Sequence, residues 1–134
     1  MPEVNAELAT DRNPEELAKL VTDFYGIHTW ASGVRDTVPG EARSNTRLCT
    51  LVTGATVVEE LLGSGPGFVR YRMITDSTSP LQDYVAELRV TPGAAGGSVL
   101  TWGAAFTCDP AIEEPLAANV RATFERGLED LLAT

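Results

Sequence analysis

The fold is decided by the last stretch of the chain, residues 115–132, which reads PLAANVRATFERGLEDLL. Its apolar residues recur at steps of three or four, which is typical of one helical face. They are Leu116, Val120, Phe124, Leu128 and Leu131. Charged and amide side chains occupy the opposite face, and Pro115 suits a first turn, where its missing N–H costs no hydrogen bond. The sequence therefore predicts an amphipathic terminal helix that the rest of the chain must cover.

The residues ahead of this helix read mostly as β-strands. Runs rich in Val, Leu, Thr, Tyr and Trp alternate with turns that contain Gly or Pro, a pattern typical of antiparallel hairpins. The predicted strands are 3–8, 34–38, 46–53, 56–62, 68–75, 81–91 and 98–107. After the first strand, Asn13, Pro14 and Glu16 give a helix start signal, Gly26 ends that helix, and a short helical turn or tight loop is expected at 27–30. This order predicts an α+β fold in which a sheet of about seven strands closes around the terminal helix.

Length and charge restrict the possible classes of function. The chain has 134 residues, which fits one domain over 1–134, and its net charge is −9. An acidic surface argues against nucleic acid and anionic membranes as partners. No apolar run approaches the roughly 18 residues that span a bilayer, and the start MPEVNAELAT lacks the features of a signal peptide. A cytoplasmic location is therefore expected, without membrane insertion.

The residues that bind metals are too sparse for a metal site. His28 is the single histidine, and Cys49 and Cys108 fall in separate predicted strands. Their positions are typical of reduced core cysteines rather than of zinc ligands. The glycine-rich loops at 63–67 and 93–97 are not followed by a helix start that would hold a phosphate. We expect no metal and no cofactor.

Strand 56–62 is the most informative for function, because each of its faces carries a glutamate. A hairpin loop centred on Gly65 places Glu60 opposite Arg70 as an outer ion pair. Glu59 then points inward, directly opposite Tyr71. The same pairing scheme places Tyr71 opposite Tyr84, and Tyr84 opposite Phe106.

Several of these stretches resemble the START/Bet v 1-like (SRPBCC) superfamily, in its polyketide cyclase/dehydrase and lipid-transport group. They are RLCTLVTGATVVEELL, VRYRM, PLQDYVAELRVTP, SVLTWGAAFTCDP and the GLEDLL of the last helix. The resemblance implies a helix-grip fold, in which a curved antiparallel sheet wraps the C-terminal helix and leaves a cavity. Cavities in this family hold hydrophobic molecules such as lipids, polyketides or steroid-like compounds.

The candidate site residues face this expected cavity. Glu59 and Tyr71 are the candidates for acid–base catalysis, because a desolvated carboxylate can act as acid or base near neutral pH. Alternatively, Glu59 is a structural carboxylate bonded to Tyr71 or to an arginine such as Arg47. The candidates for ligand binding are Trp30, Met73, Tyr84, Leu88, Trp102, Phe106, Val120 and Phe124.

Three functions are compatible with these residues. The first is binding of a hydrophobic, lipid- or polyketide-like molecule between sheet and helix. The second is a cyclase, aromatase or dehydratase that folds a poly-β-ketone chain in the cavity without metal or organic cofactor. The third is a non-catalytic protein-interaction module whose cavity is filled by side chains. The protein is expected to be a monomer or a homodimer.

Overall fold

The computed structural model describes residues 2–134, which form seven strands, two α-helices and three short 3-10 helices. The strands are β1 (Glu3–Thr10), β2 (Val34–Pro39), β3 (Thr46–Leu51), β4 (Thr56–Gly65), β5 (Phe68–Ile74), β6 (Gln82–Pro92) and β7 (Ser98–Thr107). The helices are α1 (Pro14–Val21), η1 (Phe24–Thr29), η2 (Ala94–Gly96), η3 (Pro110–Ile112) and α2 (Glu113–Leu132). The predicted element order is confirmed.

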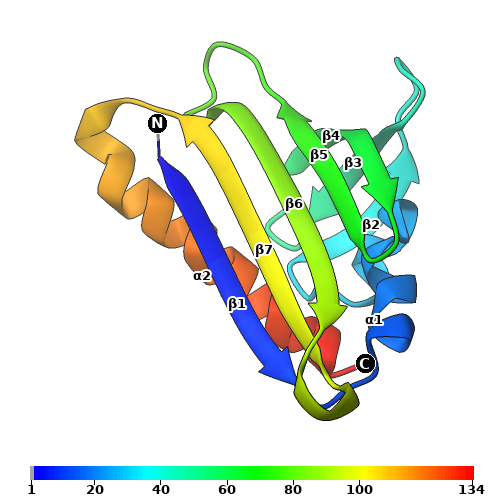
Figure 1. The fold of residues 1–134 in the computed structure, drawn as a ribbon. Helices are drawn as coiled ribbons and strands as arrows, with labels where there is room; N and C mark the ends of the chain where they lie inside the picture. Colours follow the sequence, from blue (N-terminus) through cyan, green and yellow to red (C-terminus); the bar gives the residue numbers. More distant parts are fainter. Residues whose placement is uncertain (1) are drawn as a thin grey trace.

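The strands form one antiparallel sheet in the order β1-β7-β6-β5-β4-β3-β2. Strands β2 to β7 follow one another as a meander, and the last strand, β7, pairs with the first strand, β1. Helix α2 crosses behind β1 and β7, while α1 and η1 lie behind the other half of the sheet (Figure 1). This is the expected helix-grip arrangement, with two short helices after the first strand.

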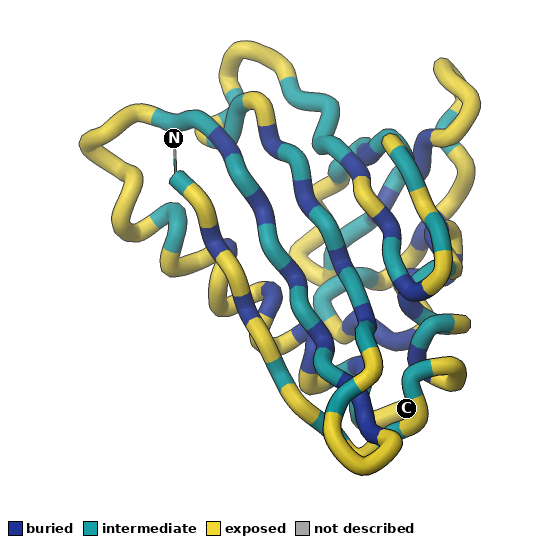
Figure 2. The backbone as a smooth tube through the Cα atoms, viewed as in Figure 1, coloured by how far each residue is buried: buried dark blue, intermediate teal, exposed yellow. Residues whose placement is uncertain are grey.

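Helix α2 packs through the face that the sequence predicts. Val120, Phe124, Leu128 and Leu131 are buried, and Leu116 is half-buried near the N-terminal end. The Phe124 ring stacks on the Trp102 ring of β7, with 4.7 Å between centroids and 13° between planes. Figure 2 shows the alternation of buried and less buried positions along β6 and β7, of which β7 contacts α2 and β6 contacts α1.

Helix α1 begins at the predicted cap. The Asn13 side-chain oxygen accepts from the backbone N–H of Glu15 at 2.8 Å and of Glu16 at 3.4 Å, and Pro14 occupies the first turn. Leu17 and Val21 are buried beneath the sheet. The cap satisfies amide groups that the first helical turn leaves free.

The register between β4 and β5 differs from the predicted one by two residues. Glu59 lies opposite Met73, and Tyr71 lies opposite Leu61. The hairpin closes through a tight turn at 66–67 instead of a five-residue loop, and the register shifts between Leu61 and Gly63. A tight turn alone would shift the register by an odd number of residues and turn Glu59 to the outer face. The extra residue in the bulge makes the shift even, so Glu59 still faces inward.

The neighbouring registers give one correction and one confirmation. Tyr71 pairs with Ala86 rather than with Tyr84, again a difference of two residues. The β6–β7 register agrees with the predicted pairing of Tyr84 with Phe106: the next pair along, Val85 and Ala105, lie opposite each other, and the Tyr84 and Phe106 rings stack at 6.4 Å. The predicted cross-strand row from Glu59 to Phe106 is therefore wrong as a continuous row.

Candidate functional site

The inner face of β3 and β4 carries a buried ion pair. Arg47 and Glu59 are register partners, and the arginine Nε and Nη2 donate to one carboxylate oxygen of Glu59 at 2.9 and 2.7 Å. Only 2% of the Arg47 side chain and 10% of the Glu59 side chain are exposed. The remaining Nη1 donates to the Phe24 carbonyl at 2.6 Å, so the arginine also anchors η1 to the sheet.

Aromatic rings complete the surroundings of this arginine. Its guanidinium lies 4.1 Å from the centroid of Phe24 and 5.0 Å from that of Tyr71, within cation–π range. Burial is the largest single effect and lowers the pKa of Arg47, but the charge and hydrogen bond of Glu59, together with Tyr71 and Cys49, outweigh it, and the net pKa is raised. The arginine is therefore a permanent cation, and Glu59 is its counter-ion.

The thiol beside the ion pair is inactive as a nucleophile at neutral pH. The Cys49 sulfur lies 4.0 Å from the Glu59 oxygen that binds Arg47. Burial, followed by the Glu59 charge, raises the pKa of Cys49 to about 11. Because the thiolate is the reactive form, this cysteine is a core residue, as the sequence predicts.

The two inner-face tyrosines are buried and protonated. Tyr71 accepts a hydrogen bond from the Trp102 indole N–H at 3.0 Å. Burial is the largest cause that raises the pKa of Tyr71 and of Tyr84 well above 10.0. At neutral pH either phenol can donate a proton in a hydrogen bond, but neither is a base.

Trp102 stands at the centre of an aromatic layer between sheet and helix. It stacks on Phe124 and contacts Trp30 at 5.8 Å between centroids. A Cβ added to Gly127 of α2 would lie 2.4 Å from the Trp102 ring, so only glycine allows this close approach. The Trp30 indole N–H is buried without an acceptor in residues 2–134.

A pocket of about 410 Å³ opens beside this layer, between α2 and the β2–β3 end of the sheet. It is lined by Trp102, by residues of segments 27–34 and 51–53, and by one stripe of α2. The stripe consists of Asn119, Ala122, Thr123, Arg126, Gly127 and Asp130. The opening lies near the junction of η1 and β2.

The predicted site residues divide between this pocket and the core. Among them, Trp102 lines the pocket, whereas Glu59 and Tyr71 lie apart from it in the interior. Met73 is half-buried on the inner face of β5. The remaining candidates are buried core residues: Trp30, Tyr84, Leu88, Phe106, Val120 and Phe124.

Sequence reasoning missed the helical stripe along the pocket. Its residues recur at steps of three and four, just beside the buried face of α2. The available signal in the sequence was the pair of small residues, Ala122 and Gly127, beside the polar Thr123 and Arg126. A fully solvated helix face has no need of small residues, whereas a pocket wall does.

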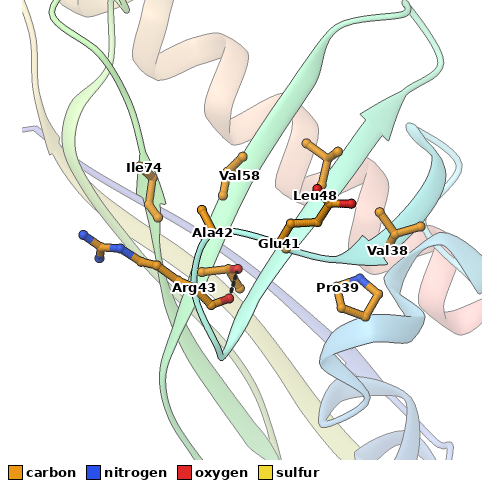
Figure 3. A pocket seen from close by; sticks show the side chains of 10 residues that line it. Val38, Pro39, Glu41, Ala42, Arg43, Leu48, Val58 and Ile74 are labelled. Carbon is orange, nitrogen blue, oxygen red and sulfur yellow. Dashed lines mark hydrogen bonds between the residues drawn. The ribbon is translucent and has the colours of Figure 1, made fainter.

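A second pocket, also of about 410 Å³, lies on the outer face of the sheet. Its apolar lining includes Leu48, Val58 and Ile74 (Figure 3). These three residues are register partners and are adjacent in sequence to the inward-facing Arg47, Glu59 and Met73. The loop at 40–43 forms its rim. The sheet separates this hollow from α2, so it is distinct from the pocket at the helix.

Features of other site classes are not found in residues 2–134. These residues contain no group of three or more His, Cys, Asp and Glu side chains placed to hold a metal ion. None of the helices formed by residues 2–134 is long and apolar enough to cross a membrane.

Comparisons with known proteins agree on the fold. XoxI from Bacillus cereus has a similar structure, with a TM-score of 0.88 and 19% identity over 98% of this chain and 93% of that chain. The Zhui aromatase/cyclase from Streptomyces sp. R1128 has a TM-score of 0.77 and 16% identity over 98% and 92% of the two chains. Aha1 from Colwellia psychrerythraea, described as a dimer in solution, has a TM-score of 0.74 and 11% identity over 98% and 93%.

The family assignment rests on the whole sequence. No curated protein sequence matches the chain. A family model described as polyketide cyclase / dehydrase and lipid transport matches residues 1–134. The chain therefore belongs to the polyketide cyclase / dehydrase and lipid transport family.

Proposed function

We propose that this protein binds a hydrophobic small molecule non-covalently in the pocket between α2 and the β2–β3 end of the sheet. The position of that pocket carries the proposal: it opens between the sheet and the C-terminal helix, with the Trp102 ring in its wall. Its volume of about 410 Å³ falls within the roughly 300–1,000 Å³ typical of small-molecule sites.

The chemistry of the lining supports an apolar ligand. Ile27, Ala31, Val34 and Leu51 contribute aliphatic surface, and the aromatic layer around Trp102 gives a rigid wall. Burying apolar ligand surface there gains about 25 cal/mol for each Å² removed from water. The description of the family includes lipid transport, which agrees with a lipid- or polyketide-like ligand.

The proposal is tested by blocking the pocket. Ala122 is an exposed helical residue in the lining, so Ala122→Trp fills the space without disturbing the core. Titration with decanol, followed by tryptophan fluorescence and calorimetry, should give saturable binding to the wild type and much weaker binding to the blocked variant. A matched control is Ala118→Trp, at an exposed position of the same helix outside the lining. Equal decanol binding by wild type and the Ala122 variant would contradict the proposal.

A second candidate is a cyclase, aromatase or dehydratase, with Glu59 and Tyr71 as catalytic residues. The buried carboxylate and phenol on the inner face favour it, as does the structural similarity to an aromatase/cyclase. This role requires a ligand that passes beyond Trp102 to reach residues already bonded to Arg47 and Trp102. Turnover of a poly-β-ketone substrate that is lost in Glu59→Gln, with binding retained, would favour the enzyme.

A further inference from the structure

We infer that the ligand of the α2 pocket carries an anionic group, such as a carboxylate, that pairs with Arg126 at the pocket wall. The inference rests on the proposed function and specifies the chemical class of its ligand. Arg126 is the only basic residue among those that line the pocket. It projects from the exposed part of α2 beside the apolar surface around Trp102.

Arg126 has no ion-pair partner among residues 2–134. Lys19, Arg35, Arg70 and Arg121 also form no ion pair within this range, but Arg126 is the one unpaired basic residue that lines the pocket. Glu129 and Asp130 follow it at positions i+3 and i+4, from which side chains can reach it on a helix. An arginine without an intramolecular partner, next to an apolar hollow, is available to a ligand anion.

Asp130, the acidic residue in the lining, is bonded elsewhere. One of its carboxylate oxygens accepts from the Ser32 backbone N–H at 2.8 Å and from the Ser32 hydroxyl at 2.6 Å. These bonds tie the loop before β2 to the C-terminal half of α2. Asp130 forms no ion pair with Arg126.

The charge pattern favours an anion over a neutral ligand at this position. A carboxylate can accept two parallel hydrogen bonds from a guanidinium, which makes such pairs strong and directional. The alkyl part of the same ligand would lie against the aliphatic residues and Trp102. Together these features select an amphiphile with one acidic end.

The test compares three probes of equal chain length: decanoate, decanol and decylamine. Each is titrated into the purified protein at low salt and again at high salt, with calorimetry and tryptophan fluorescence as readouts. The wild type should prefer decanoate to decanol by about two- to fivefold, the value of one solvent-exposed ion pair. Added salt should reduce this preference, because the pair lies at the surface.

Arg126→Gln is the decisive variant, and its exposed position makes misfolding no concern. It should lower the ratio of decanoate to decanol affinity to near one. Arg121→Gln removes the same charge from the same helix outside the pocket, so its ratio should match that of the wild type.

The possible failures can be distinguished. If decanoate and decanol bind the wild type equally, or Arg126→Gln keeps the preference, the inference is overturned while the pocket proposal stands. If none of the three probes binds, or all bind Ala122→Trp as well as the wild type, the proposed function itself fails. Preference for decylamine would show that the acidic surface, and not Arg126, governs selection.

Discussion

Adjacent glutamates on β4 allow a direct test of how the protein uses its inner face. The perturbation is Glu59→Gln, compared with Glu60→Gln one residue later. Glu59 faces inward and pairs with Arg47, whereas Glu60 faces outward and pairs with Arg72 at 2.6 Å and Arg43 at 3.3 Å. The two substitutions are chemically identical, so their difference reports the environment alone.

The expected magnitude follows from burial. The Arg47 side chain is only 2% exposed, and Glu59→Gln removes its counter-ion. Removing one partner of a buried ion pair costs about 3–5 kcal/mol of stability. Glutamine still offers a carbonyl oxygen to the arginine, and the Phe24 carbonyl remains, so the low end of the range applies. At Glu60 the arginine partners are 39% and 57% exposed, and solvent screens the pair.

Urea unfolding followed by far-UV circular dichroism provides the assay. The unfolding midpoint of Glu59→Gln should fall by more than about 1 M, given typical urea slopes. The midpoint of Glu60→Gln should stay within experimental scatter. Replacing both members of the buried pair, as in Arg47→Met with Glu59→Leu, should recover stability relative to Arg47→Met alone.

The refuting results are specific. Equal midpoints for the two glutamine variants would show that Glu59 is not a desolvated counter-ion. Additive costs in the Arg47 and Glu59 double variant would show that the pair does not interact. A Glu59→Gln protein as stable as the wild type, but with impaired turnover or ligand affinity, would favour the catalytic role over the structural one.

Three further predictions concern packing and titration. Phe124→Ala should cost about 3–5 kcal/mol in urea unfolding, because the ring is buried against Trp102; a cost below 1 kcal/mol, by the same scale, would contradict this packing. Gly127→Ala should cost about 1–3 kcal/mol, because its Cβ would clash with the Trp102 ring. The companion change Trp102→Phe should reduce that clash, and full additivity would argue against it. At about pH 8 iodoacetamide should alkylate half-exposed Cys108 faster than Cys49, whose pKa of about 11 keeps it protonated. Because the pKa of Cys49 in the folded protein lies above the ordinary 9.0, the protonated thiol contributes its full stabilisation of the fold below pH 9.0. This contribution is lost as the pH rises towards 11. The urea midpoint of Cys49→Ser should therefore fall less between pH 9 and 11 than that of the wild type. An equal fall would show that other groups cause the loss of stability at alkaline pH.

The sequence by itself determined the elements and the faces that they bury. Periods of two and of three to four are local properties of the chain, since each follows from backbone geometry within one element. They predicted the buried face of residues 115–132. The inward direction of Glu59 came instead from the assumed hairpin centred on Gly65, and it is correct although that register is wrong by two residues, because an even shift keeps each residue on its face. The β6–β7 register was predictable because its loop is flanked by two long alternating strands.

The tertiary structure alone decided the pairing of β4 with β5. A five-residue loop and a tight turn with a bulge are both compatible with the glycines at 63, 65 and 67. The selection between them depends on which register fits the neighbouring strands and the layer beneath, so local sequence leaves it open. The two-residue difference removed Tyr71 from its predicted place opposite Glu59.

Only the assembled fold decided the partners of the site residues. Arg47 was one of two possible partners for Glu59, and the β3–β4 register brings them together across the sheet. The pocket joins segments near residues 30, 52 and 125, which no sequence pattern relates. Such long-range contacts depend on the distance between the curved sheet and the helix. That distance is set by the volumes of the side chains that meet there, such as Trp102 against Gly127.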